Sequence, residues 1–345
     1  MNKLDKLVKN FMMAFLILTV TSAGFCGFFL KWSFREGSES FGFTALIEQT
    51  AKRPFVHRQL LPVAVKKTVE ILPEHTKEKL SKNLIEKKHI EKRFAQAEIP
   101  EKYVLEYYLM FIFCFLIFFA SICVLRLLLI EVTKDKVTGT VGALLFGLLF
   151  PFFEVLGGYY YDFGEILFFF LAALLAVRKK FIPLLLITPF AEWNKESFLF
   201  FAATLFPFLG MKKTLSIMFT AGVSYLYVRQ LFENNPGDMA DGRFFEHLEN
   251  IFDIKSYFLT DSIYGVPLPS RMFFLHIIYV LWIAKNFWYK LTDEWKLHAK
   301  IALVINTILY FMFVVPGELR DLSMLYISLM ILTTYFLKSI KENEN

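Results

Sequence analysis

Long runs of apolar residues are the feature that most constrains the fold of this chain. The first run, Val8–Leu30, is long enough to cross the hydrocarbon core of a bilayer, which takes roughly 20 helical residues. Of the 345 residues, 56% are hydrophobic and 42 are Phe, more apolar surface than a soluble core of this size can use. No segment shows the alternation of a transmembrane β-strand. The chain is therefore predicted to be an all-α polytopic membrane protein.

About ten crossings are predicted, all within one transmembrane domain over residues 1–345. The predicted spans and half-spans cover 8–30, 103–130, 138–156, 166–177, 181–191, 198–211, 215–231, 271–284, 301–315 and 322–337. The short pieces at 181–191 and 198–211 are either two tilted crossings or one re-entrant hairpin.

Two longer polar segments separate these spans and are predicted to be external loops. The first, 31–102, contains an amphipathic helix around Lys66 and Lys67 that is predicted to lie on the bilayer surface, followed by a charged, solvated helix over 75–94. The second, 232–270, is polar and contains Asp and Asn residues.

The connections between spans alternate in character. One set is basic and, by the positive-inside bias, lies in the cytoplasm. Its residues are Lys3, Lys6, Lys9, Arg126, Lys134, Lys136, Arg178–Lys180, Lys212, Lys213, Lys285–Lys300, Lys338 and Lys341. The other set mixes carboxylates with aromatic residues and faces outward. Both termini are thus predicted to be cytoplasmic in a plasma or inner membrane, with an external active face. This topology accounts for the net charge of +6, so no nucleic-acid partner is predicted.

The island Gly157–Glu165, GGYYYDFGE, carries two carboxylates between long apolar runs. Ionisable groups at the edge of a membrane segment are costly to hold there and are functional candidates. Asp162 and Glu165 are three residues apart, so they share a face of a helix, and a partly buried carboxylate can act as a general base. Both are predicted to be catalytic. The alternative is that they only complement the dipole at a helix N-terminus.

A compact cationic cluster precedes the predicted surface helix. It consists of Arg53, His57 and Arg58. Guanidinium groups bind phosphate bidentately, so the cluster is predicted to recognise a lipid phosphate or pyrophosphate. Ordinary attraction to anionic lipid head groups is the alternative interpretation.

Two further islands carry paired charges between apolar segments. Lys195 is predicted to hold a phosphate, with Glu196 as its partner; a short loop with a self-satisfied ion pair is the alternative. Glu318 and Arg320, next to Asp321, are predicted to belong to the same site or to cap a helix. No metal-binding motif is present, and the spacing is compatible with a divalent cation without requiring one.

These islands resemble motifs of the integral-membrane GT-C glycosyltransferases. RPFVHRQLLP resembles the Pro-aromatic-x-x-Arg-x-Leu-x-Pro pattern of that family, and YYYDFGE, NKES and GELRDLSMLY resemble later outer-face motifs of its bacterial members more loosely. The resemblance covers most of the chain and is mainly architectural. It implies transfer of a sugar from a polyprenyl-phosphate donor to a glycan, lipid or protein acceptor on the outer face of the membrane. The membrane lipids are then a further partner. It also implies a catalytic carboxylate in the first external loop, Glu36 or Glu39, where the family more usually has Asp.

The mechanism that this resemblance implies needs one base and one cationic site. Glu36, Glu39 or Asp162 would deprotonate the acceptor hydroxyl while the sugar leaves its lipid phosphate. Arg58, helped by the other island cations, would stabilise the charge developing on that phosphate. Replacing Arg58 by Ala is expected to abolish transfer and to leave the protein folded.

Two other classes of membrane protein remain open. A secondary transporter of a polar or anionic solute would also use broken helices and intramembrane charges, although no inverted repeat is visible. A membrane acyltransferase or polysaccharide polymerase is the other alternative. An acyltransferase would rely on a histidine within the bundle, where the sequence places only His276.

Overall fold

A computed structural model of the chain describes residues 3–36, 38–86, 99–237, 243–263 and 266–343. Within these ranges the chain is helical, apart from strand β1 (Thr260–Ile263) paired antiparallel with β2 (Val266–Pro269). Six helical segments of the described chain are long and apolar enough to cross a membrane. They are α1 (Lys3–Trp32), α6 (Val104–Thr133), α7 (Lys136–Phe153), α8 (Tyr160–Val177), α15 (Asp293–Phe313) and α16 (Tyr326–Asn343) with the preceding turn η5 (Leu319–Leu325). The chain is a helical, multi-pass membrane protein.

The other predicted crossings are helical too, but they are shorter or more polar. Helices α9 (Phe181–Asn194) and α14 (Phe274–Phe287) have 14 residues each, and α12 (Met211–Leu231) has 21 but includes several polar side chains. The segment 198–211 breaks into α10 (Ser197–Ala203) and α11 (Phe206–Leu209). Ten crossings therefore stay a prediction.

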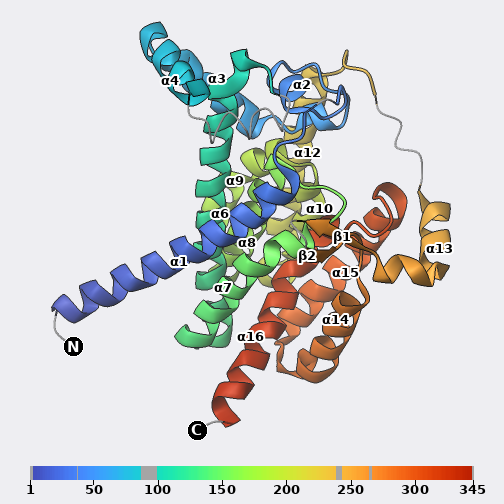
Figure 1. The fold of residues 1–345 in the computed structure, drawn as a ribbon. Coiled ribbons are helices and arrows are strands. Elements are labelled where there is room, and N and C mark those ends of the chain that lie inside the picture. The colour runs from blue at the N-terminus through green and yellow to red at the C-terminus, as the bar shows by residue number, and fades with distance from the viewer. Residues whose placement is uncertain (1–2, 37, 87–98, 238–242, 264–265, 344–345) are drawn as a thin grey trace.

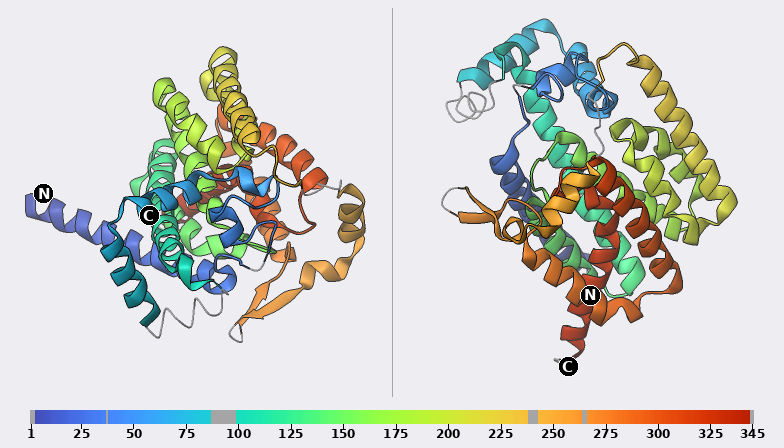
Figure 2. Two further views of the ribbon diagram at one scale, coloured as in Figure 1. Left: turned by 90° about the horizontal axis from the view of Figure 1, so that it is seen from above. Right: turned by 90° about the vertical axis from the view of Figure 1, so that its right-hand side faces the viewer.

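The first polar segment forms a helical cap on one end of the bundle (Figure 1). It contains α2 (Phe43–Ile47), η1 (Phe55–His57), α3 (Leu60–Ile71), α4 (Glu74–Glu86) and η2 (Glu101–Tyr103). Helix α3 covers the predicted amphipathic segment and packs on α6. Helix α4 follows Pro73, and the predicted continuation of this helix to residue 94 lies outside the described residues. Both termini lie toward the opposite end of the molecule (Figure 2).

The second polar segment is not uniformly polar. Besides the hairpin it contains α13 (Phe244–Phe252) and η3 (Ile254–Phe258), both rich in exposed apolar residues. The turn η4 (Trp288–Lys290) later joins α14 to α15.

Basic connections meet at the end of the bundle that holds the termini. Lys338 donates to the carbonyl of Thr133 at 3.2 Å, and Lys341 pairs with Asp135 at 2.7 Å. Asp135 in turn accepts the first amide hydrogens of α7 and caps that helix. Arg178, at the end of α8, pairs with Glu131 of α6 at 3.2 Å. Three of the connections predicted to share one side of the membrane, 126–136, 178–180 and 338–341, thus lie together.

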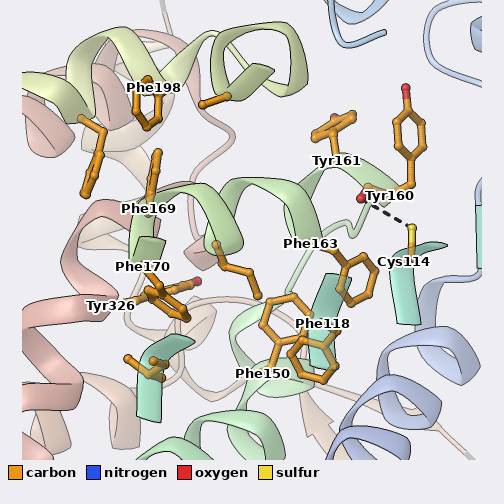
Figure 3. Packing of buried hydrophobic residues seen from close by; sticks show 14 of the residues in the cluster. Cys114, Phe118, Phe150, Tyr160, Tyr161, Phe163, Phe169, Phe170, Phe198 and Tyr326 are labelled. Carbon is orange, nitrogen blue, oxygen red and sulfur yellow. Dashed lines mark hydrogen bonds between the residues drawn. The ribbon is translucent and has the colours of Figure 1, made fainter. Parts of the chain in front are cut away.

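Helix α8 lies in the interior of the bundle and packs on α6, α9 and α10. Its Phe163 ring lies 5.6 Å from that of Phe118 and 5.4 Å from that of Phe150 (Figure 3). It also lies 4.6 Å from the ring of Phe28 in α1. Small residues in α7 allow close approach, since a Cβ built on Gly24 of α1 would lie only 2.0 Å from the Gly147 carbonyl oxygen. This packing fixes the N-terminus of α8 beneath the cap.

Candidate functional site

Asp162 caps the N-terminus of α8 and also binds two cations. Its Oδ2 accepts the amide hydrogen of Tyr159 at 2.9 Å. Arg320 Nη1 lies 3.2 Å from both carboxylate oxygens, and Lys195 Nζ lies 3.3 Å from Oδ1. Asp162 is therefore a helix cap, which is the alternative interpretation of the sequence, and it is also ion-paired; its catalytic role stays a prediction.

Lys195 lies at the centre of a buried group of carboxylates. Besides Asp162, its Nζ binds Glu165 Oε2 at 2.9 Å and Asp321 Oδ1 at 3.2 Å. Glu165 also accepts a hydrogen bond from Ser197 Oγ at 2.5 Å. Asp162 and Glu165 share one face of α8, as their spacing predicts.

Arg320 extends this network toward the last span. Its Nε donates to Glu318 at 2.7 Å, and its Nη2 lies 3.5 Å from Asp321. We call the whole group the ion cluster. It consists of Asp162, Glu165, Glu318 and Asp321 with Lys195 and Arg320. With four carboxylates around two cations, the cluster already neutralises its own positive charges, which leaves little attraction for a phosphate.

The prediction that Lys195 pairs with Glu196 is wrong. Helix α9 ends at Asn194 and Lys195 has an extended backbone, so consecutive side chains point to opposite sides. Lys195 points into the ion cluster, whereas Glu196 accepts hydrogen bonds from Arg58, at 3.0 Å from Nε and from Nη2 as well.

Arg58 joins the cap to the bundle. Its guanidinium lies over the Tyr161 ring, 4.4 Å from the centroid, and its carbonyl accepts a hydrogen bond from Tyr160 Oη at 2.9 Å. Burial acts to lower the pKa of Arg58, but the Glu196 carboxylate outweighs this and keeps the pKa well above its usual value. Arg58 is therefore a fixed, paired cation.

His57 and Arg53 lie apart from the ion cluster. His57 packs 6.1 Å from the Tyr225 ring and 6.4 Å from the Phe232 ring, and burial lowers its pKa. Arg53 donates its amide hydrogen to the Pro236 carbonyl at 2.9 Å and so ties the first loop to the second. Of the cationic cluster, only Arg58 reaches the bundle interior.

Glu36 and Glu39 line a pocket of about 420 Å³ in the cap. Glu36 Oε2 accepts hydrogen bonds from the Thr44 amide at 2.8 Å and from the Thr44 hydroxyl at 3.0 Å, which holds its carboxylate at the start of α2. Glu39 is exposed. The other lining residues are Ser38, Thr44, Ala45, Glu48, Thr50, Lys52 and Pro236.

Several other buried or ring-stacked polar side chains are not identified by the sequence patterns. Glu154 is buried between α7 and α8, and its Oε2 has no hydrogen-bond partner in the described chain. Arg35 stacks on the rings of Trp32 and Tyr159. His298 is buried within the bundle and bonds the Thr204 carbonyl at 2.9 Å, so His276 is not the only histidine there. His298 belongs to the polar stretch DEWKLHAK at the start of α15, so its burial could not be predicted from the sequence.

The closeness of α8 and α9 at the site depends on Gly164. Asn194 Nδ2 donates to the Tyr161 carbonyl at 2.9 Å, and a Cβ on Gly164 would lie 2.1 Å from Asn194 Oδ1. Gly164→Ala must therefore push Asn194, and Lys195 with it, away from α8. We expect a loss of about 1–3 kcal/mol in unfolding free energy, measured by thermal unfolding in detergent. Gly222→Ala, where nothing lies within 4 Å, is the control and should be neutral or slightly stabilising. Equal stability of both variants would contradict this close contact.

Within the described ranges, no group of three or more His, Cys, Asp or Glu side chains could hold a metal ion. The carboxylates of the ion cluster instead surround an ammonium nitrogen. Comparison with known proteins gave no match: no protein-family model, no curated protein and no solved structure matches this chain.

Proposed function

We propose that this protein is a membrane glycosyltransferase that moves a sugar from a polyprenyl-phosphate donor to an acceptor at the cap end of the bundle. The observation that carries the proposal is the pocket lined by Glu36 and Glu39 in the first loop, whose Phe41 ring lies 5.5 Å from that of Tyr159 at the N-terminus of α8. Polar islands that are far apart in the sequence also meet in the ion cluster at the N-terminus of α8. The cap end would face outward, and the spans not identified by length and hydropathy would complete about ten crossings.

The donor phosphate would be bound best by cations that have no carboxylate partner. Arg58, Lys195 and Arg320 are already paired with carboxylates. In the described chain, no carboxylate lies within ion-pair distance of Arg35, Lys52 or Arg53. Lys52 lines the pocket, the Arg53 amide donates to the carbonyl of the lining residue Pro236, and Arg35 directly precedes the lining residue Glu36. We assign the phosphate to this second group, because these cations need not give up a carboxylate partner when they bind an anion.

The acceptor hydroxyl would be deprotonated by a carboxylate of the pocket. Glu36 is held in place by Thr44, which orients it, whereas Glu39 is exposed to the pocket. Asp162 already accepts hydrogen bonds from one amide and two cations, so its carboxylate oxygens are occupied, and we assign it to positioning the α8 N-terminus.

The test is transfer of label in liposomes that contain the purified protein. Radiolabelled polyprenyl-phosphate sugars are supplied with a crude acceptor extract, and Glu36→Gln and Glu39→Gln are compared with the unchanged protein. Loss of the base should lower the rate by about 10²–10⁴-fold in one of these two variants. Glu74→Gln, in exposed α4, is the matched control and should keep full activity. Full transfer by both pocket variants would overturn the assignment of the base, and no transfer with any donor would overturn the function.

A secondary transporter is the second candidate, and one observation favours it. The chain breaks between α9 and α10 at Lys195, and the ions beside this break are buried inside the bundle. Broken helices that surround charged groups are typical of transporter binding sites. Accumulation of solute in the same liposomes, without chemical change, would distinguish this candidate from the glycosyltransferase.

A further inference from the structure

Helix α13 presents its apolar face away from the rest of the protein. At 3.6 residues per turn, its apolar side chains fall on one side of the helix and its polar ones on the opposite side. The apolar residues are all exposed: Phe244 by 45%, Phe245 by 76%, Leu248 by 37%, Ile251 by 43% and Phe252 by 79%. Ile254 and Phe258 of η3 are exposed as well. Water is a costly environment for a face of this kind.

The flank of α13 holds it to the bundle, together with Phe244 at the edge of its apolar face, whose ring lies 6.2 Å from that of Phe311 in α15. His247 is buried against α15, with its ring 4.6 Å from that of Tyr310 and 5.0 Å from that of Phe311. Its Nε2 bonds the Val314 carbonyl at 2.9 Å, and the Arg243 amide donates to the Met312 carbonyl at 3.3 Å. These contacts fix α13 at the C-terminal end of α15, outside the bundle (Figure 1).

The apolar face of α13 therefore continues the lipid-facing surface of a span. Near its end, α15 exposes Ile308, Met312 and Phe313, by 58%, 43% and 57%. We propose that α13 and η3 form an interfacial anchor, with their apolar face embedded in the lipid bilayer beside the end of α15. The second external loop is then held against the membrane at this point, independently of the proposed enzymatic function.

The charges of the anchor show what kind of lipid contact to expect. The side of α13 opposite the apolar face carries Glu246 and Glu249, followed by Asp253, while Arg243 and Lys255 lie at the two ends. Anchors that depend on anionic lipids carry Lys and Arg on this side. Binding here should come from burial of apolar side chains and should not require anionic lipid.

The test places spin labels on the two sides of α13 in the full chain. Phe245→Cys and Phe252→Cys label the apolar face, and Glu249→Cys is the matched control on the polar side. All are made in a Cys26→Ser background, because Cys26 is exposed, and the unsubstituted background supplies the blank. In phosphatidylcholine liposomes, labels at 245 and 252 should collide severalfold more with oxygen than with a water-soluble nickel chelate, and the label at 249 should show the reverse.

Two other outcomes would overturn the anchor, and a third would overturn its independence of anionic lipid. Equal access of the nickel chelate to 245, 252 and 249 would place the face in water. Poor access of both reagents to 245 and 252 would mean that protein, such as a second copy, covers it. A protected face that appears only after phosphatidylglycerol is added would mean that anionic lipid drives the contact.

Discussion

Replacing Lys195 by Met should destabilise the protein more than any other single change at the site. Lys195 is the shared partner of Asp162, Glu165 and Asp321, all within 3.3 Å of its Nζ. Without the ammonium group, these buried carboxylates would repel one another with only Arg320 to compensate. Removing one partner from a buried ion pair costs about 3–5 kcal/mol, and here one cation serves three anions. Thermal and denaturant unfolding in detergent would measure the loss.

A matched exposed pair separates this effect from the loss of any lysine. Lys67 pairs with Glu70 on the surface of α3, with 68% and 46% of the two side chains exposed. Lys67→Met should change the unfolding free energy by less than about 1 kcal/mol. Adding Glu165→Gln to Lys195→Met should recover part of the stability, because one uncompensated anion is removed. If Lys195→Met unfolded like Lys67→Met, the ion cluster would not be a buried structural unit.

The sequence predicts the helices best where apolar length decides them. The segment 103–130 was predicted as a span and forms α6, since a long apolar run ended by charges has few alternatives in a bilayer. The shared face of Asp162 and Glu165 was also predictable, because the period of the helix fixes it. The alternation of basic and mixed connections also made it predictable that the islands with Asp162, Lys195 and Arg320 lie on one side of the bundle.

Pairing of the charges could not be predicted, because it depends on tertiary packing. Glu196 was assigned to its neighbour Lys195, yet it pairs with Arg58 of the first loop, far away in the sequence. His57 and Arg58 are adjacent in sequence, but one packs beside aromatic rings of α12 and the other enters the bundle.

One missed feature was visible in the sequence. The segment 232–270 was interpreted as a polar loop from its Asp and Asn residues. Its stretch FFEHLENIF nevertheless repeats apolar residues at helical spacing, which is the signature of α13. Average polarity over a long segment concealed a short amphipathic helix.

If the protein is the proposed glycosyltransferase, Arg58→Lys should lower the rate of transfer while leaving the affinity for the donor unchanged. Lysine keeps the positive charge beside Glu196, but it cannot donate from both Nε and Nη2 or lie flat over the Tyr161 ring. The cap would then sit less accurately on the N-terminus of α8, and a small misplacement at a reaction centre can cost about 10²-fold. Because Arg58 is already paired, we expect kcat to fall and the KM for the donor to stay the same.

The structure also changes what the alanine variant should do. Arg58→Ala would leave Glu196 without its partner, so it should destabilise the fold as well as abolish transfer, and Arg58→Lys is the cleaner test. Arg178→Lys, at an exposed pair with Glu131, is the matched control and should change neither constant. A raised KM in Arg58→Lys would instead mean that Arg58 leaves Glu196 to bind the donor phosphate. Unchanged kcat and KM would mean that Arg58 contributes only to folding, since the geometry of the cap would then not matter to the reaction.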